Sequence, residues 1–588
     1  MNNLLILLQD DLSTENWLTS PGVIGTIILI IIVVFLAIFI LIKRLNNYVD
    51  LLDKNTEDLT ETEFERKLIN LSEEEVDDIL ELRQKGFKIK TEHGTAVIKE
   101  IPSNHSGFIK KIIDPKNPLF DEKSKTFDKI KVSPQLREII VWYLTAAVFW
   151  LVFGTLVGQY LGMKFLWPEM DNASWLSFGR LRPVHTNTVF WGWASLAMVG
   201  LGHYVVAKTS NCEIFSYRRS KIAFWLMNAS VVIGNIFLMA GINNGGGEYR
   251  EYIWPVMALF AIGLIITFIN FYKTVANRKL SEIYISNWFI LASLIWTIVL
   301  SFIGYIPHYQ DGLGETVIQG YYMHQGVGMW FMTFTLGLVY YFLPAALNKP
   351  IYSYSLGVLA FWTQMLFYTL IGTHHFVFSP LPWWLQTVAI VFSAGMFIPV
   401  FAGSTNFLMT MRGSWNNISK SYVLPFFLVG VVFYFVGSVQ GSFQAFRFTN
   451  YLWHFTDFNV AHSHMTMYGI ITFLLWACVY SLMPKITGIE PPQNLVGAHF
   501  WLAFIGLIAY MVSLMVGGTL KGLSWIEGNP FIESVILMKE YWVWRAVGGS
   551  LMFISHLIFA YNFYLMVRKQ RPITLSRKQK REQQINTP

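Results

Sequence analysis

The sequence predicts an all-α polytopic membrane protein, with a core of twelve transmembrane helices and one extra transmembrane helix before them. Of its 588 residues, 54% are hydrophobic, 16% are aromatic and only 14% are charged. This composition is typical of polytopic membrane proteins and excludes an ordinary large soluble protein. The two cysteines, Cys212 and Cys478, form no CxxC pair. This excludes a disulfide framework, a zinc ribbon and covalent haem attachment through CxxCH.

The chain before the core has two parts. Residues 23–42 are uncharged and long enough to cross a bilayer, and Asp10 and Asp11 precede them where a signal peptide would carry basic residues. We therefore predict an external N-terminus over 1–22 and an extra transmembrane helix over 23–43. The polar stretch 44–137 carries no motif, and we interpret it as a cytoplasmic insert.

Twelve apolar segments follow, and each is long enough to cross a membrane as a helix. Lys and Arg recur in every second loop and in the tail, so these loops are predicted to be cytoplasmic. The net charge of +7 comes largely from that tail, 568–588, which favours a cytoplasmic C-terminus and no nucleic-acid partner. The predicted segments are 138–163, 184–206, 220–241, 254–274, 286–306, 321–344, 356–374, 385–410, 421–440, 458–483, 497–518 and 542–566.

Six histidines are predicted to share one depth, in the outer part of the membrane. Each lies near the external end of its segment under the topology above, and ionisable residues inside a membrane are usually functional. Buried histidines that merely pack between helices would not be expected to share a level. The six are His185, His324, His374, His375, His462 and His464.

Neutral imidazole binds copper, zinc and haem iron, so the six histidines suit a set of metal centres. Three nitrogens, from His324 and the adjacent His374 and His375, suit a copper ion with an open position. Adjacent histidines point about 100° apart on an α-helix, so they share a metal only near a helix end or a distortion. The other three histidines suit one haem with two axial imidazoles and one haem with a single axial imidazole.

These residues resemble subunit I of the haem–copper oxidases, and most closely the cbb3-type (C-family) cytochrome c oxidases. The resemblance is carried by Arg182-Pro-Val-His185, by His324-Gln-Gly-Val-Gly328, by Tyr368 six residues before the paired histidines, and by His462-Ser-His464. It covers about 138–567. It implies a twelve-helix haem–copper oxidase core in a bacterial inner membrane, with the N-terminus outside and the C-terminus cytoplasmic.

The resemblance implies a role for each histidine. His185 and His464 would be the axial ligands of a low-spin haem b. His462 would be the proximal ligand of a high-spin haem b3, opposite a single copper ion held by His324, His374 and His375. The implied function is that of a terminal oxidase, which reduces O2 to water and couples this reaction to proton translocation. Electrons would come from cytochrome c through c-type haems on partner subunits, since this chain has no CxxCH.

Tyr368 distinguishes oxidases from the related nitric oxide reductases. In the cbb3-type family that these residues resemble, a tyrosine at this place is covalently joined to the copper ligand that matches His324, and it supplies a proton and an electron. Nitric oxide reductases instead carry an iron-binding carboxylate one turn after the first metal histidine. That position here is Gly328, which has no ligating group.

Three further positions follow from the resemblance. Arg182 is expected to pair with a haem propionate, and Glu248 resembles a residue that helps bind calcium near the propionates. Gln440 departs from the family, which usually has glutamate there, and glutamine can hydrogen-bond but does not titrate. Hydroxyl groups of Thr333, Thr335, Tyr340 and Thr363 are a candidate proton path to Tyr368, and their alternative role is helix packing.

Three other functions compete with the oxidase. A nitric oxide reductase would hold non-haem iron at His324, His374 and His375. A twelve-span proton-coupled transporter would use the histidines as a relay and would contain no haem. An electron-carrying b-type cytochrome would need only His185 and His464 and would leave four histidines unexplained.

Overall fold

The computed structural model describes residues 131–171, 173–245, 247–280, 282–305, 312–418 and 420–568. These residues form helices and connecting loops, with no strand among them. The predicted external N-terminus over 1–22, the extra helix over 23–43, nearly all of the insert over 44–137 and the tail after residue 568 lie outside the described residues.

The helices follow one another closely, and several membrane crossings are divided into consecutive α, π and 3₁₀ pieces. The elements are α6 (Pro134–Lys164), η4 (Pro168–Met170), η5 (Ser174–Leu176), α7 (Phe178–Asn187), η6 (Thr188–Ala194), α8 (Ser195–Ser210), α9 (Tyr217–Ala240), α10 (Trp254–Ala276), α11 (Ile285–Tyr305), α12 (Gly312–Gln325), η8 (Gly326–Met332), α13 (Thr333–Leu347), α14 (Tyr354–Phe367), η9 (Tyr368–Leu370), η10 (Gly372–Phe376), α15 (Trp383–Gly395), α16 (Phe397–Met411), η11 (Trp415–Asn417), α17 (Leu424–Gln444), α18 (Arg447–Trp453), α19 (Asp457–His464), η12 (Met465–Thr472), α20 (Phe473–Thr487), α21 (Gln493–Ile526) and α22 (Phe531–Arg568).

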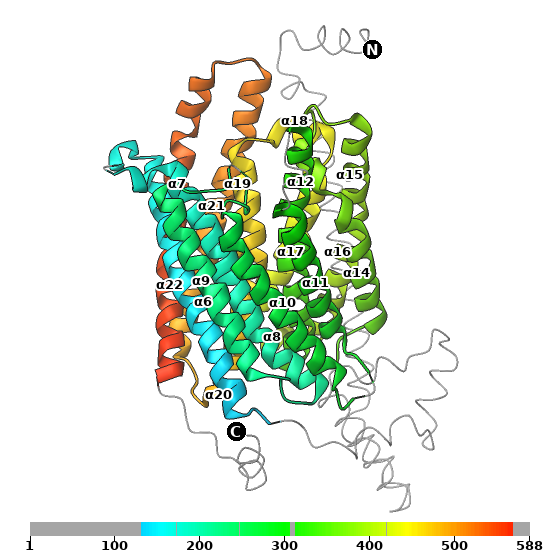
Figure 1. Cartoon of the computed structure of the whole chain (residues 1–588). Coiled ribbons are helices and arrows are strands. Elements are labelled where there is room, and N and C mark those ends of the chain that lie inside the picture. Colours follow the sequence, from blue (N-terminus) through cyan, green and yellow to red (C-terminus); the bar gives the residue numbers. More distant parts are fainter. Residues whose placement is uncertain are drawn as a thin grey trace, which may run out of the picture. The chain divides into compact units, whose positions relative to one another are not determined.

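The twelve predicted segments of the core are confirmed, since the described residues contain twelve helical stretches long and apolar enough to cross a membrane. The largest differences lie at helix ends. The segment predicted over 542–566 is part of α22, whose 38 residues would extend about 57 Å at 1.5 Å per residue. Since a bilayer's hydrocarbon core is about 30 Å thick, this helix must extend beyond it. Figure 1 shows α21 and α22 projecting together at one end of the bundle.

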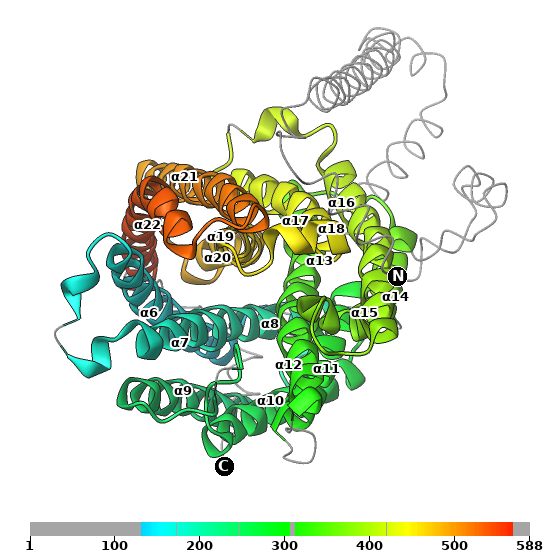
Figure 2. The same cartoon turned by 90° about the horizontal axis from the view of Figure 1, so that it is seen from above.

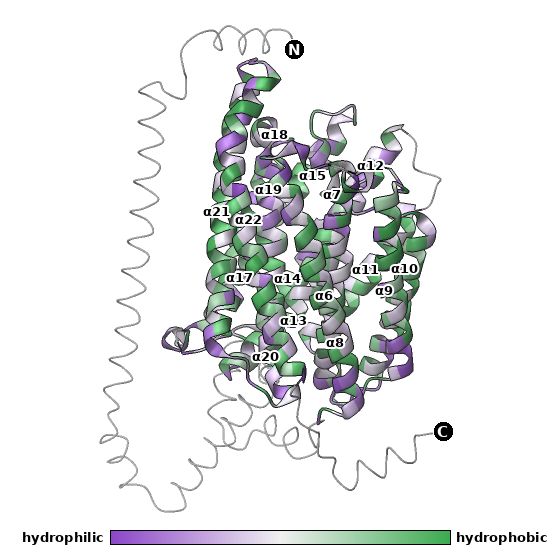
Figure 3. Cartoon of the chain, turned by 90° about the vertical axis from the view of Figure 1, so that its left-hand side faces the viewer, coloured by the Kyte–Doolittle hydropathy of each residue, from purple (hydrophilic) through white to green (hydrophobic). Residues whose placement is uncertain are grey.

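Three of the twelve spans lie at the centre of the bundle. In the most apolar window of Phe178–Ser210, Gly312–Leu347 and Asp457–Thr487, 94%, 78% and 89% of the residues are buried, whereas at most 50% are in the other nine spans. Figure 2 shows α8, α13 and α20, which belong to these three spans, surrounded by the remaining helices. Hydrophobic residues extend along the outer helices, and hydrophilic residues gather at the helix ends and loops (Figure 3).

Each central span contains one π-helical stretch close after a predicted ligand. Thr188–Ala194 begins three residues after His185, Gly326–Met332 begins two residues after His324, and Met465–Thr472 begins directly after His464. π-helical turns are rare, cost hydrogen-bond regularity and recur at functional sites. Their repetition at three predicted ligands marks this level of the bundle as the site.

Candidate metal and haem centre

The structure brings His324, His374 and His375 together as a potential metal site. One ligating atom of each lies within 4.8 Å of the other two. Nε2 of His324 and Nε2 of His374 face each other at 2.7 Å. Nitrogen atoms that converge in this way suit one metal ion, as the sequence predicted for this trio.

A local change of helix type lets two adjacent histidines serve one site. The α14 helix ends at Phe367, and His374 and His375 lie on the 3₁₀ segment η10. This segment crosses α12 at two glycines, because a Cβ on Gly372 would lie 2.5 Å from the carbonyl oxygen of Gly320. The distortion that two adjacent metal ligands require is therefore present, and backbone contact fixes it.

A hydrogen bond orients His374. Its Nδ1 lies 2.7 Å from Oγ of Ser393, whose hydroxyl donates to the carbonyl oxygen of Ala389. Because that hydroxyl proton is committed, Ser393 accepts the Nδ1–H and leaves the lone pair of Nε2 facing the other histidines. No pattern in the sequence selects Ser393, since only the fold brings α15 beside η10. The donor set therefore fits copper: one buried and two half-buried imidazoles, with at least one oriented ring.

Tyr368 packs between the histidine cluster and Gly328. Its ring centroid lies 5.3 Å from that of His324. A Cβ added to Gly328 would lie only 1.6 Å from Cε1 of Tyr368. A carboxylate at position 328, which a nitric oxide reductase would need for its iron, thus has no room while Tyr368 keeps its place.

His185 and His464 face each other as the predicted haem ligands should. Their ring centroids are 6.4 Å apart and their planes differ by 15°. Nδ1 of His185 lies 2.7 Å from the carbonyl oxygen of Gly154, and Nδ1 of His464 lies 2.8 Å from that of Val460. Since a carbonyl only accepts, each Nδ1 carries the proton and each Nε2 keeps its lone pair. Two near-parallel imidazoles with free Nε2 lone pairs fit the axial positions of one haem.

His462 faces a different space from His464. Thr456 caps α19, which places both histidines on its last turn. Nδ1 of His462 lies 2.8 Å from Oε1 of Gln440, which accepts the proton and fixes the tautomer. A cavity of about 600 Å³ is lined by His462 and by all three histidines of the cluster, together with Tyr368. This cavity fits a haem held by His462 on one side, with the histidine cluster on the other.

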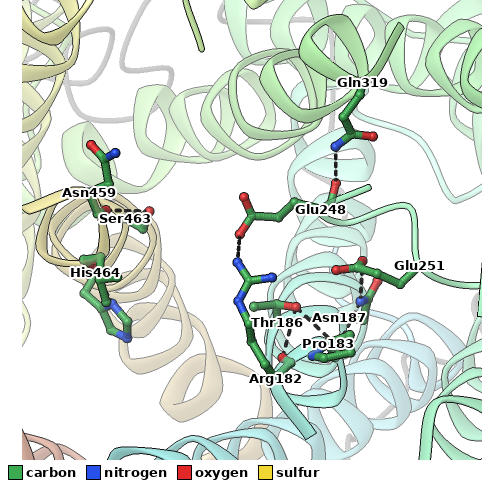
Figure 4. Close-up of polar contacts among 11 residues, drawn as sticks. Arg182, Pro183, Thr186, Asn187, Glu248, Glu251, Gln319, Asn459, Ser463 and His464 are labelled. Carbon is green, nitrogen blue, oxygen red and sulfur yellow. Dashed lines mark hydrogen bonds and ion pairs between the residues drawn. The ribbon is translucent and has the colours of Figure 1, made fainter. Parts of the chain in front are cut away.

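Arg182 and Glu248 lie at the edge of this cavity. Nη2 of Arg182 donates to Oε1 of Glu248 at 2.6 Å, and the Glu248 carbonyl oxygen accepts from Gln319 at 3.1 Å (Figure 4). Nearby, Glu251 is buried and accepts a hydrogen bond from Asn187 at 2.8 Å. Burial raises the pKa of Glu251 to about 7, although the Asn187 hydrogen bond acts in the opposite direction.

The candidate proton path from the sequence is only partly brought together. Thr363 is bonded back to the carbonyl oxygen of Leu359, and Thr333 to that of Gly328, as in ordinary helix packing. Oη of Tyr340 is buried without a partner. Tyr434 lines the cavity with Tyr368, and its position was not evident from its spacing on α17.

Comparison with known proteins gives the family that the sequence motifs resemble. Residues 138–551 match the model of the family described as cytochrome c and quinol oxidase polypeptide I. The chain is 30% identical to the cbb3-type cytochrome c oxidase subunit CcoN1 of Stutzerimonas stutzeri, over 74% of this chain and 96% of the relative. It is 31% identical to a cytochrome c oxidase subunit 1 homolog of Agrobacterium tumefaciens strain T37, over 73% and 83%.

A solved structure of a heme-copper terminal oxidase dimer shares the fold, with a TM-score of 0.62 and 16% identity. It matches 76% of this chain and 86% of that one. The family match extends over the region where the structure places the six histidines. The chain therefore belongs to the cytochrome c and quinol oxidase polypeptide I family, as a subunit I of the cbb3 type.

Proposed function

We propose that this chain is the catalytic subunit of a membrane-embedded terminal oxidase that reduces O2 to water and couples the reaction to proton translocation. The observation that carries the proposal is the shared cavity: His462 and the cluster of His324, His374 and His375 line the same space, beside Tyr368. When bound, a high-spin haem b3 and a copper ion would supply the redox chemistry there. The side chains of this chain would hold these groups, orient the ligands and supply protons to the site.

The proposal gives each histidine one role. His185 and His464 hold a low-spin haem b, His462 holds haem b3, and the three-histidine cluster holds copper. Support comes from the tautomers, because backbone carbonyls accept from Nδ1 of His185 and His464 and leave Nε2 to bind iron. Since His462 and His464 are two residues apart on α19, one helix joins electron entry to the oxygen site.

Tyr368 is the proposed proton donor of the site. Its side chain lines the cavity, and its ring centroid lies 5.3 Å from that of His324. Its pairing with Gly328 favours the oxidase over a nitric oxide reductase, because a ligating carboxylate at that position would collide with the ring. The covalent bond between Tyr368 and His324 that the family resemblance implies belongs to this proposal.

We further propose that electrons reach the low-spin haem from c-type cytochrome subunits, which receive them from cytochrome c. The absence of a CxxCH motif in the 588 residues supports an external electron source. The basic loops and tail support an N-terminus outside and a C-terminus in the cytoplasm of a bacterial cell.

Tyr340 and Tyr434 are better candidates than Thr333 or Thr363 for the last groups of a proton path before Tyr368.

Arg182 and Glu248 are proposed to lie at the propionate edge of the haems. Arg182 pairs with the carboxylate of Glu248 in the structure. A haem propionate is also a carboxylate, so Arg182 can bind it in the same way. Glu248 alone does not fit calcium, which takes six to eight oxygen ligands. A calcium ion here would need propionate oxygens to complete its ligands.

The test is a reduced-minus-oxidised visible spectrum of the purified complex, with and without carbon monoxide. The proposal expects two b-type haems, of which carbon monoxide perturbs only one, and one copper per chain by metal analysis. Tyr368→Phe should abolish oxygen consumption and leave both haem spectra. Absence of b-type bands would exclude the oxidase, iron in place of copper would favour the reductase, and full turnover of Tyr368→Phe would remove its proposed role.

A further inference from the structure

Buried polar side chains form a second network, separate from the cavity, between α20, α21, α22 and α6. Hydrocarbon packing needs no such groups, and each one costs free energy unless it is hydrogen-bonded. The network consists of two hydrogen-bonded groups, one on each side of Trp476. We call it the α20–α22 column, and it consists of Tyr480, His499, Asn562, Trp476, His556, Tyr468, Ser555 and Thr155.

The first group lies toward the loop between α20 and α21. Oη of Tyr480 is 3.1 Å from Nδ1 of His499 and accepts from Nδ2 of Asn562 at 3.1 Å. The ring of Tyr422 packs against that of Tyr480 at 6.2 Å, and its hydroxyl donates to Glu490 in the loop. Glu490 is exposed and Tyr480 is fully buried, so Tyr422 separates this end of the column from solvent.

The second group lies beside the predicted low-spin haem ligands. Nδ1 of His556 is 3.0 Å from Oγ1 of Thr155, and Nε2 of His556 is 3.1 Å from Oη of Tyr468. The Tyr468 hydroxyl also lies 3.4 Å from Oγ of Ser555. Thr155 directly follows Gly154, whose carbonyl oxygen accepts from His185, and Tyr468 is four residues after His464.

Polar atoms without partners lie where the two groups meet. Trp476 packs against His499 at 4.4 Å and against His556 at 5.6 Å. Nε1 of Trp476, Nε2 of His499 and Oδ1 of Asn562 have no hydrogen-bond partner, and all three residues are fully buried. Buried polar atoms are almost always paired with protein or ordered water, so the junction calls for bound water.

The column thus extends from the loop that holds Glu490 to the level of His185 and His464. Tyr480 and Tyr468 are twelve residues apart, or about 18 Å along the helix. Its side chains are hydroxyls and imidazoles, which both donate and accept protons and can pass them along hydrogen bonds. His556 is the last titratable imidazole before the low-spin haem position. It is faced by Thr155 of α6, Tyr468 of η12, Trp476 of α20, His499 of α21 and Ser555 of its own helix.

We propose that the α20–α22 column binds internal water and makes His556 a redox-linked proton site for the low-spin haem. The inference rests on the proposed function, since it needs that haem at His185 and His464. When one electron reduces the haem, one proton moves from the aqueous phase near Glu490 through the column to His556. When the haem is oxidised, the proton returns from His556 through the column to the same aqueous phase. Charge therefore balances near the haem at each step.

The equilibrium test is the midpoint potential of the low-spin haem in the complete oxidase complex, measured by spectroelectrochemical titration over a pH series. The potential should fall as pH rises, because reduction carries a proton with it, and His556→Gln should lose that pH dependence. The matched control is His203→Gln. His203 is equally buried and, like His556, has hydrogen-bond partners at both ring nitrogens, but its partners Val199 and Ser220 lie outside the column, so the control should keep the pH dependence.

A kinetic test uses Tyr480→Phe, which removes one hydroxyl and keeps the ring packing. Proton uptake on rapid haem reduction, followed with a pH dye, should slow, while the equilibrium pH dependence stays. A low-spin haem with a pH-independent potential, or His556→Gln that keeps the wild-type pH dependence, would overturn the inference. If His556→Gln fails to incorporate haem, wild-type uptake rates in Tyr480→Phe would overturn it. Absence of the low-spin haem in the wild type would instead contradict the proposed function.

Discussion

At the scale of single residues, Gly328 and Tyr368 can only be understood as a pair. The ring occupies the place where any side chain at 328 would begin. We predict that Gly328→Ala displaces Tyr368 and costs about 1–3 kcal/mol, as overpacking does, together with most of the oxygen consumption. Thermal unfolding and oxygen electrode measurements check this. Adding Tyr368→Ala should restore stability but not turnover, and additive destabilisation would show that the two sites are independent.

Gln440 sets the hydrogen bond of His462. Its amide oxygen is a neutral acceptor for Nδ1–H at 2.8 Å. In Gln440→Glu a carboxylate would draw that proton more strongly, make the ligand more basic and favour the oxidised iron. We therefore predict a lower midpoint potential for the high-spin haem and an unchanged potential for the low-spin haem, which serves as the internal control. Equal shifts in both haems would contradict a local effect.

Glu251 gives stability a pH dependence. Its pKa is raised by burial from 4.5 to about 7, so the folded state binds more protons than the unfolded state between these values. Below pH 4.5, Glu251 therefore contributes about 3 kcal/mol to the free energy of unfolding. This contribution is lost as the pH rises through 7. Thermal melts of Glu251→Gln should lack this decline, because glutamine stays neutral and can still pair with Asn187. Parallel pH profiles for both proteins would rule Glu251 out.

At the scale of elements, the sequence predicted where the helices lie better than what kind of helix they are. Hydropathy located all twelve spans, and the six histidines with their spacing located the site. The three π-helical stretches were not predicted, because residues such as Gly326–Met332 have no pattern that separates a π-turn from an α-helix. The hydrogen bonds that Ser393 and Gln440 accept from His374 and His462 were also missed, since each joins elements that only the tertiary fold brings together.

The crossing of α12 and η10 makes a prediction at this scale. Gly320 and Gly372 approach so closely that a Cβ on either one would collide with backbone of the other. We predict that Gly372→Ala moves η10 away from α12 and separates His374 and His375 from His324. Copper content should fall while the low-spin haem spectrum stays. Gly497→Ala on α21, where an added Cβ would meet no atom within 4 Å, is a control for glycine replacement, and wild-type copper in Gly372→Ala would refute the argument.

At the scale of the whole described bundle, hydropathy does not reveal which spans are central. The three central spans have mean hydropathies of 1.4, 1.5 and 1.6, but the outer span Tyr354–Phe376 also has 1.4. What sets the central spans apart is burial on all sides, and burial depends on how twelve helices pack. The ligands were therefore easier to predict than the walls around them, because histidine is conspicuous in a membrane whereas a packed leucine is not.

The same arrangement predicts how the bundle responds to loss of its cofactors. All three central spans line the cavity of about 600 Å³ and carry proposed ligands, so a bound haem adds contacts that the unfolded chain lacks. A ligand present at 100 times its Kd stabilises the folded state by about 2.7 kcal/mol, and at 1,000 times by about 4.1 kcal/mol. We predict that protein made without haem unfolds at a clearly lower temperature in detergent. Copper removal alone should have a smaller effect, because the histidine cluster closes on itself through the 2.7 Å contact between His324 and His374. Equal melting temperatures with and without haem would mean that helix packing alone determines the stability of the bundle.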